Sequence, residues 1–301
     1  MAVRLVDQVD GVADVSSIAS MARAAEDAGF DAVWATDHPA PPDTVNGSGG
    51  HHALDPFVLL TAAAAATTRL RLLTYACVLP YRNPFLVAKQ VASLDAVSRG
   101  RVILGVATGY VEDEFHALGV EFEQRNEASD DAIAVLRRAW TGEPVEGDWP
   151  TFRAAAIRTW PRPAQPGGPP IWVGGNSRRA MRRAVELGDG WMPFPSDRAR
   201  AALTRTAAIG DMADLGKAIV AAKEHARDVG RTAPLDIVFA PLFRETWSRI
   251  SEPDRLQESI TELTAAGVTY FVMQLPVHTA AEFCDAAARM GSVLSPTKVA
   301  S

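Results

Sequence analysis

The sequence is poor in cysteine, with Cys77 and Cys284 the only two thiols in 301 residues. Two thiols cannot build the disulfide framework that small secreted domains use. The longest apolar stretch, residues 57–66, has about half of the ~20 residues that a membrane-spanning helix requires. Acidic residues occupy the N-terminal positions where a signal peptide would need an apolar run. We therefore expect a cytoplasmic protein that does not span a membrane.

Basic charge is also scarce. The chain has 30 Lys and Arg against 36 Asp and Glu, for a net charge of −6, and it has no run of basic residues. Arginines do not alternate with aromatic residues, so neither nucleic acid nor an anionic membrane is an expected partner. This balance favours an enzyme that acts on a small-molecule substrate.

Short Val, Ile and Leu runs alternate along the chain with longer alanine-rich segments of helical period. This alternation is typical of parallel βα units whose strands are covered on both faces. Strands are predicted at residues 3–9, 32–35, 70–75, 101–107, 170–173, 190–194, 235–241 and 269–274. Helices are predicted at residues 16–27, 55–67, 84–98, 128–141, 178–186, 213–228, 253–265 and 280–290. Eight repeats predict a closed (β/α)₈ TIM barrel, a fold of about 250 residues, with residues 1–301 as one domain.

Two segments interrupt this alternation. Residues 39–54 are rich in turn formers and follow the second predicted strand, so we expect a lid or pocket wall there. Residues 142–169 contain several prolines and two tryptophans, and we expect a short hairpin over the barrel mouth. Both insertions are predicted to flank the active site at the C-terminal ends of the strands, where barrel enzymes keep their chemistry.

A carboxylate and an imidazole follow the second strand, in the sequence Thr36-Asp37-His38. By spacing alone, these residues could equally be a carboxylate that caps a turn and an exposed histidine with no function. Their position at the C-terminal end of a strand favours function. His38 could act as a general base, with a neighbouring carboxylate fixing its tautomer and orientation.

Small and aromatic residues replace the aliphatic pattern where the third strand ends, at Thr74, Tyr75, Ala76 and Cys77. A bulge or a rare non-proline cis peptide is plausible at 75–77, because such backbone is kept mainly where function uses it. Asn83-Pro84, a few residues on, is interpreted as an N-cap followed by proline at the first helical position.

The fourth strand runs into Thr108-Gly109-Tyr110. The glycine lets a flat ligand approach the backbone, and Thr108 offers a hydroxyl to it. Glu112 and Asp113 are interpreted as first-turn helix residues that complement the helix dipole. The sequence leaves the role of Glu114 open.

Gly174-Gly175-Asn176-Ser177 follows the fifth strand and opens a helix. Free N–H donors and the positive end of the dipole make such a helix start a site for phosphate. Gly-Gly turns are common in proteins without a phosphate site. The two arginines that follow, at 178 and 179, could equally lie on the solvent-exposed face of the helix. What favours phosphate is the register, which puts this turn on the same rim as His38.

Taken together, several weak motifs resemble those of the luciferase-like monooxygenase superfamily. They span roughly residues 20–195 and comprise the 29–34 run, Thr36-Asp37-His38, residues 67–70, residues 98–102, and the stretch from Gly174-Gly175 to residues 189–191. The Asp-His pair, in place of a Glu-His pair, is similar to the branch that uses the deazaflavin coenzyme F420.

This resemblance implies a (β/α)₈ barrel with the deazaflavin ring in its mouth and the cofactor phosphate at Gly174 to Ser177. It implies a cis peptide near Tyr75 to Cys77, behind the ring. We expect cofactor contacts from Asp37, His38, Thr74, Tyr75, Ala76, Cys77, Thr108 and Gly109. His38 matches the base of the sugar and alcohol dehydrogenases of the branch. We also expect a homodimer and no metal site.

One position departs from the branch. Its dehydrogenases carry a glutamate directly after the Thr-Gly that ends the fourth strand, and here that residue is Tyr110. The departure argues against sugar phosphate dehydrogenase activity and leaves a general F420-dependent hydride transfer, with Tyr110 or Glu114 as proton partner. An FMN-dependent two-component monooxygenase and a non-catalytic flavin-binding barrel are the alternatives.

Overall fold

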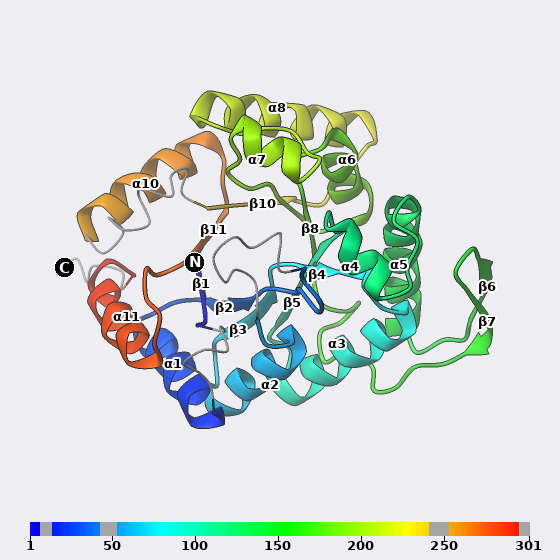
Figure 1. Cartoon of the computed structure of the whole chain (residues 1–301), viewed down its shortest axis with the longest axis horizontal. Coiled ribbons are helices and arrows are strands. Elements are labelled where there is room, and N and C mark those ends of the chain that lie inside the picture. The colour runs from blue at the N-terminus through cyan, green and yellow to red at the C-terminus, as the bar shows by residue number, and fades with distance from the viewer. Residues whose placement is uncertain (7–13, 43–52, 241–252, 295–301) are drawn as a thin grey trace.

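Eight parallel strands close into a barrel in the computed structural model, which describes residues 1–6, 14–42, 53–240 and 253–294 (Figure 1). Each strand pairs with its neighbours in chain order, and the β3–β5 and β1–β11 pairings complete the ring. The strands are β1 (Ala2–Arg4), β2 (Ala32–Ala35), β3 (Arg71–Thr74), β5 (Val102–Ala107), β8 (Ile171–Gly174), β9 (Gly190–Met192), β10 (Asp236–Phe239) and β11 (Tyr270–Met273). The predicted TIM barrel is confirmed, and the parts of the predicted strands at residues 7–9 and 241 lie outside the described residues.

A ring of long helices surrounds this barrel (Figure 1). It consists of α1 (Val15–Asp27), α2 (Pro56–Ala66), α3 (Pro84–Ser98), α5 (Arg125–Trp140), α6 (Arg178–Leu187), α8 (Met212–Asp228), α10 (Pro253–Ala266) and α11 (Ala280–Leu294). Each of the eight predicted helices is present. None of the helices in the described part of the chain is long and apolar enough to cross a membrane.

Side-chain caps fix where several helices begin. Asp14 accepts a hydrogen bond from the backbone N–H of Ser17 at the start of α1. Asn83 accepts one from Phe85 and is followed by Pro84 at the start of α3, as expected from the Asn-Pro pair. These caps satisfy N–H groups that have no partner within the helix. The boundaries therefore follow from local sequence.

Apolar side chains fill both faces of the barrel wall. The residues between strands and helices form the main core, and a second buried cluster fills the barrel interior. This inner cluster comprises Ala2, Ala32, Trp34, Leu73, Ile103, Trp172, Met192, Val238, Ala240 and Val272. Because the interior is packed, a ligand can enter only at the ends of the strands.

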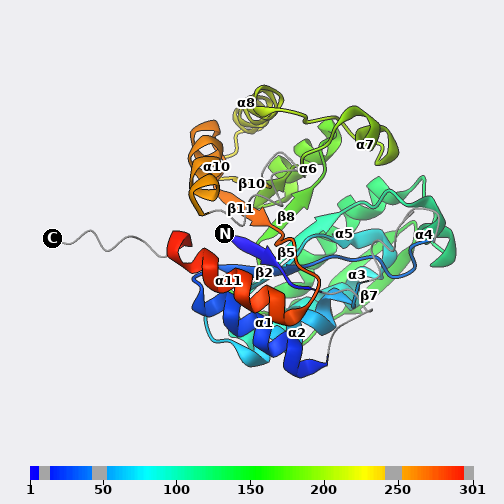
Figure 2. The ribbon, with the colours of Figure 1, turned by 60° about the vertical axis from the view of Figure 1, so that its left-hand side comes forward.

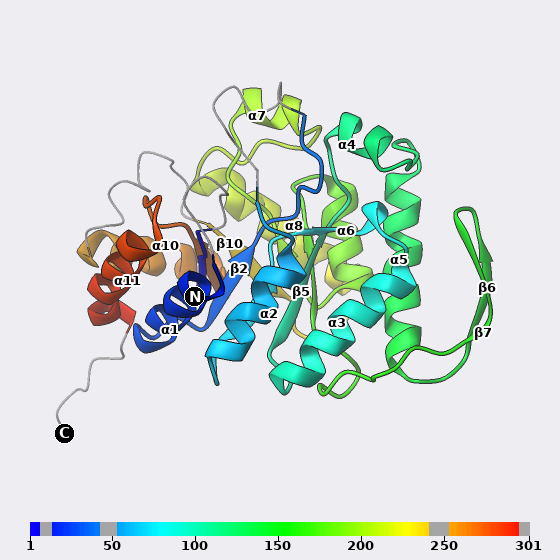
Figure 3. The same cartoon turned by 60° about the horizontal axis from the view of Figure 1, so that its bottom comes forward.

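Residues 142–169 do form a hairpin, with β6 (Val145–Trp149) antiparallel to β7 (Phe152–Ile157). The prediction that it covers the barrel mouth is wrong. The hairpin projects from the outside of the barrel, beyond α5 (Figures 1 and 3). The segment then returns to the N-terminal end of the barrel, where Gln165 donates to Asp95 at 2.7 Å and to the carbonyl of Val102 at 2.9 Å. The physical reason is that this insertion follows a helix, and helix-to-strand connections lie at the end opposite the active site.

Short elements gather at the C-terminal rim instead. They are β4 (Cys77–Val78), the 3₁₀ helix η3 (Leu79–Tyr81), α4 (Glu112–Ala117) and α7 (Arg198–Leu203). In Figure 3 α4 and α7 stand at the same end of the barrel. Most of the other predicted insertion, residues 43–52 of 39–54, lies outside the described residues.

Candidate active site

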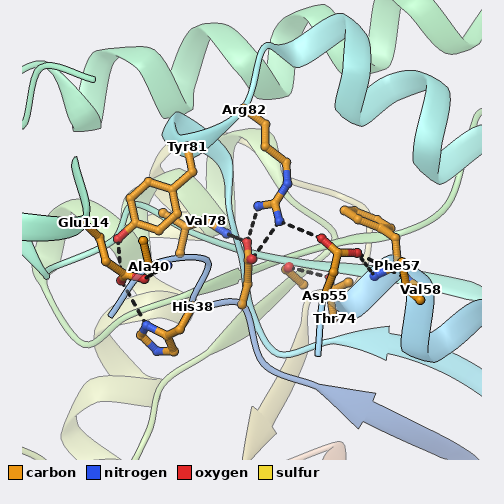
Figure 4. A network of polar contacts seen from close by, with 12 residues as sticks. His38, Ala40, Asp55, Phe57, Val58, Thr74, Val78, Tyr81, Arg82 and Glu114 are labelled. Atoms are coloured by element: carbon orange, nitrogen blue, oxygen red, sulfur yellow. Dashed lines mark hydrogen bonds and ion pairs between the residues drawn. The ribbon is translucent and has the colours of Figure 1, made fainter. Parts of the chain in front are cut away.

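A histidine and a glutamate from different loops meet at this rim. Nδ1 of His38, which follows β2, lies 3.0 Å from Oε2 of Glu114 on α4 (Figure 4). The His38 side chain is 13% exposed, whereas that of Glu114 is fully buried. The structure therefore brings two of the three side chains expected to be catalytic into hydrogen-bond distance.

Glu114 is held by two further donors. The backbone N–H of Ala40 donates to Oε1 at 3.1 Å, and the Tyr81 hydroxyl donates to Oε2 at 2.9 Å. Burial alone would raise the pKa of Glu114, but the hydrogen bonds from His38, Ala40 and Tyr81 and the attraction of His38 outweigh it and hold the pKa below its usual value. The carboxylate is thus ionised and can accept a hydrogen bond from the Nδ1–H of His38.

Asp37 has a different role from the one that its position beside His38 suggests. Its carboxylate accepts a hydrogen bond from the backbone N–H of Val78 at 2.9 Å and pairs with both terminal nitrogens of Arg82. Arg82 also reaches Asp55 at 3.2 Å. The carboxylate that contacts His38 is therefore Glu114, and Asp37 fixes the chain that follows β3.

The expected cis peptide is confirmed, because Tyr75 and Ala76 are joined by one. Of the surrounding side chains, Thr74 is buried and donates from its hydroxyl to the carbonyl of Gly105 at 2.7 Å. Cys77 is also buried, and burial together with the charge of Asp37 raises the pKa of its thiol. A flat ligand at this edge would meet Tyr75 and Ala76, which are half-buried, rather than the side chains of Thr74 and Cys77.

Tyr110 lies beside His38, with ring centroids 6.2 Å apart and the rings edge to face. Burial raises the pKa of its phenol, so the group is neutral and able to donate. Gly109, just before it, has a φ of +78°, and a Cβ there would lie 2.8 Å from Phe115 and from Val78. Only glycine fits this turn, which sets Tyr110 and half-buried Thr108 at the mouth.

The glycine turn after β8 has the strand-to-helix geometry that was expected. Gly175 has a φ of +120°, and the Ser177 hydroxyl caps α6 by accepting from the N–H of Ala180. Two of the expected donors are already used, since the N–H of Gly175 donates to Met192 at 3.2 Å and that of Asn176 to Thr206 at 3.1 Å. Among the described residues no partner is found for the N–H groups of residues 177–179.

Asn176 does not point its amide at a ligand. The amide nitrogen donates to the carbonyls of Phe194 at 2.8 Å and Ala207 at 2.9 Å, and the amide oxygen accepts from the N–H of Phe194. Asn176 therefore ties the segment after β9 to the glycine turn, and the donors open to an anion begin at Ser177.

Tyr81 and Arg82 were not expected at the site. Their side chains contact Glu114 and Asp37, which are 33 and 45 residues away. The only local signal is that a tyrosine and an arginine follow the end of a strand. Nothing in the sequence states which carboxylates these two side chains meet.

A closed barrel with a His-Glu pair and a capped helix start on its C-terminal rim defines a (β/α)₈ enzyme. The chain belongs to the luciferase-like monooxygenase family, whose sequence model matches residues 2–238. It is an oxidoreductase of that class.

Relatives with and without an assigned activity resemble the chain. An uncharacterized protein of Mycobacterium tuberculosis is 32% identical over 240 residues, which cover 76% of this chain and 77% of that protein. An F420-dependent hydroxymycolic acid dehydrogenase of the same organism is 32% identical over 179 residues, or 58% of this chain and 48% of that protein. The second match thus spans about half of that dehydrogenase.

Solved structures share the fold across nearly the whole chain. The monooxygenase RslO1 from Streptomyces bottropensis has a TM-score of 0.78 at 20% identity, with 97% of each chain covered. An F420-dependent secondary alcohol dehydrogenase in complex with an F420-acetone adduct has a TM-score of 0.75 at 17% identity, also with 97% of each chain covered. These likenesses establish the barrel.

Proposed function

We propose that this protein is a coenzyme F420-dependent oxidoreductase that transfers a hydride between the deazaflavin and a small organic substrate. Relatives at 32% and 33% identity are named as F420-dependent dehydrogenases, of hydroxymycolic acid and of glucose 6-phosphate. The observation that carries the proposal is the contact between His38 and Glu114, because a proton must be accepted or given wherever a hydride is exchanged with an alcohol or a carbonyl.

The residues present fit such a cofactor. The unpartnered N–H groups of residues 177–179 offer a phosphate the positive end of α6. At the other side of the mouth, Tyr75, Ala76 and Trp34 give a flat ring an apolar wall next to the packed barrel interior. When bound, the deazaflavin supplies a carbon that gives or takes a hydride, and all proton handling falls to the protein.

His38 is suited to this role because Glu114 receives the proton of Nδ1. In the neutral ring, Nε2 is then the basic nitrogen, so His38 can take a proton from a substrate hydroxyl or return it to a carbonyl. The ionised carboxylate also stabilises the imidazolium that forms. Tyr110, neutral and beside the imidazole, is the second proton donor in this proposal.

An FMN-dependent monooxygenase is the second candidate, favoured by the family's name and by the barrel shared with RslO1. Both functions use a phosphate at α6 and a ring in the mouth. They differ in what happens at His38, because a monooxygenase reacts a reduced flavin with oxygen and needs no substrate-derived proton at that base.

An anaerobic turnover assay tests the proposal. The protein is incubated with oxidised F420 and a panel of primary and secondary alcohols, and loss of the visible absorbance of the deazaflavin is followed. We expect absorbance loss with at least one alcohol for the parent and a rate at least about 10²-fold lower for His38→Ala. In a separate aerobic assay, oxygen consumption with reduced FMN and substrate faster than without protein, together with no deazaflavin reaction in either direction, would support the monooxygenase instead.

A further inference from the structure

The segment of residues 193–209, which carries α7, is fastened at both ends. The Asn176 amide binds the carbonyls of Phe194 and Ala207, as described above. Ser196 and Ile209 form an antiparallel bridge across the base of the segment. A loop closed in this way holds its tip in a defined place rather than sampling many positions.

The same segment is also attached to the far side of the rim. Arg205 pairs with Glu112 of α4 at 2.8 Å, and its guanidinium lies 4.7 Å from the centre of the Phe122 ring. In Figure 2 α7 and α4 stand one above the other at the edge of the barrel. The segment therefore leads from β9 back across β8 toward the loop that follows β5.

Arg200 lies on α7, close enough to the barrel mouth for its charge to act on two tyrosines there. The positive charge of Arg200 acts on the phenols of Tyr75 and Tyr110, where burial raises each pKa and the arginine partly opposes that rise. These two tyrosines follow β3 and β5, on the side of the mouth that also holds His38. The charge of Arg200 is therefore felt on the side of the mouth that holds His38.

In the described part of the chain, the Arg200 side chain donates no hydrogen bond to another residue. Its Nε is buried without a hydrogen-bond partner, and its guanidinium forms no ion pair with any residue in the described ranges. Other arginines of this region behave differently, since Arg82, Arg183 and Arg205 each pair with a carboxylate. A guanidinium whose donors have no protein partner is suited to a planar, bidentate acceptor.

We propose that Arg200 binds an oxyanion of the substrate, a carboxylate or a phosphate, and so selects acidic substrates for the hydride transfer. The inference rests on the proposed function, which assigns the cofactor's own phosphate to α6. It adds a substrate class to that function, and it gives the mouth of a chain with net charge −6 a positive group that is not neutralised internally.

Calorimetric titration of the F420-loaded protein with inorganic phosphate and, separately, with acetate tests this inference. Loading with F420 fills the α6 site, so any remaining oxyanion site is a different one. We expect one or both anions to bind the parent and Arg200→Gln to weaken that binding about tenfold or more. Arg200→Lys should restore part of the loss, and the anion that binds tells carboxylate from phosphate.

Arg198→Gln is the matched control, because Arg198 lies on the same short helix and is exposed. It should leave anion binding within about twofold of the parent. Arg200→Gln should also leave F420 affinity within about twofold. A large loss of F420 affinity with unchanged anion binding would overturn the inference, as would a loaded parent that binds neither anion.

A failure of the proposed function can be distinguished from a failure of this inference. If the parent does not bind F420, the proposed function is wrong, and the same anion titrations are made on the cofactor-free protein. A tenfold difference between the parent and Arg200→Gln then still supports an oxyanion site at Arg200. Equal affinities overturn it.

Discussion

Nδ1 of His38 lies 3.0 Å from Oε2 of Glu114, although 76 residues separate the two along the chain. The loops after β2 and β5 converge at the rim to make this contact. Because the carboxylate is fully buried and also held by Ala40 and Tyr81, it orients the imidazole in a fixed direction. The pair is therefore the proton-handling unit of the proposed reaction.

Replacing His38 by alanine separates a catalytic role from a binding role. If His38 handles the proton, kcat should fall by about 10²-fold or more, while the Kd for F420 changes by less than about threefold. Steady-state rates at saturating cofactor and fluorescence titration of F420 provide the two values. His116→Ala is the control, since His116 is on α4 beside Glu114 but exposed, and it should change neither. A normal rate with a much weaker Kd would mean that His38 only packs against the ring.

Glu114→Gln should destabilise the fold in a pH-dependent way. An amide cannot accept all three of the hydrogen bonds that the carboxylate accepts, so we expect a loss of about 1–3 kcal/mol in the free energy of unfolding at neutral pH. The folded-state pKa of Glu114 lies below its usual value of 4.5. Its contribution to stability is thus complete above 4.5 and disappears as the pH falls through the folded-state pKa.

Urea unfolding at neutral pH and in acid measures this effect. The difference between parent and Glu114→Gln should shrink as the pH is lowered, whereas Glu112→Gln, which removes an exposed pair with Arg205, should cost less than about 1 kcal/mol at either pH. A difference that grows in acid would contradict an ionised Glu114 in the folded protein.

Two tyrosine variants distinguish proton transfer from positioning. Tyr110→Phe removes a neutral phenol beside His38 and should lower kcat by about 10²-fold if this hydroxyl exchanges the proton. Tyr81→Phe removes one hydrogen bond to Glu114 and should instead cost about 1 kcal/mol of stability with a small change in kcat. Rates and unfolding free energies of both variants are compared. The reverse pattern would assign the proton to the Tyr81 and Glu114 side of the site.

The glycine turn after β8 can be tested at a single position. Gly175→Ala adds a Cβ that would lie 3.0 Å from Ala180 at a φ of +120°, and this strain alone should reduce stability. Gly175→Asp adds the same atom and a negative charge next to the expected phosphate. We therefore expect the aspartate variant to bind F420 about tenfold more weakly than the alanine variant. Equal affinities in two folded variants would place the phosphate elsewhere.

The barrel was predictable because its information is local. Eight aliphatic runs alternate with eight helical segments, and the caps at Asp14 and Asn83 set helix starts without tertiary help. Glu112 and Asp113, interpreted as first-turn residues, do lie in the first turn of α4. The position of the hairpin, in contrast, could not be predicted from local sequence. The composition of residues 142–169 identified them as an insertion. The end of the barrel at which an insertion lies depends on whether a helix or a strand precedes it.

The partners of the site residues depend on tertiary structure. Asp37 and His38 are adjacent in the chain, yet Asp37 faces Arg82 and His38 faces Glu114. Successive residues leaving a strand point in opposite directions, so adjacency in the sequence does not predict a shared contact. The position of Arg200 could not be predicted either, because it depends on the contacts that residues 193–209 make with Asn176 and Glu112.

Parallel titration of the cofactor-free protein with coenzyme F420 and with FMN measures directly which of the two cofactors this barrel binds. Fluorescence of each chromophore gives its Kd under the same buffer conditions, and Gly175→Asp serves as the variant that should weaken whichever cofactor uses the α6 site. For an F420-dependent enzyme we predict a micromolar or tighter Kd for F420 and binding of FMN at least about a hundredfold weaker. Micromolar binding of FMN with no binding of F420 would contradict it.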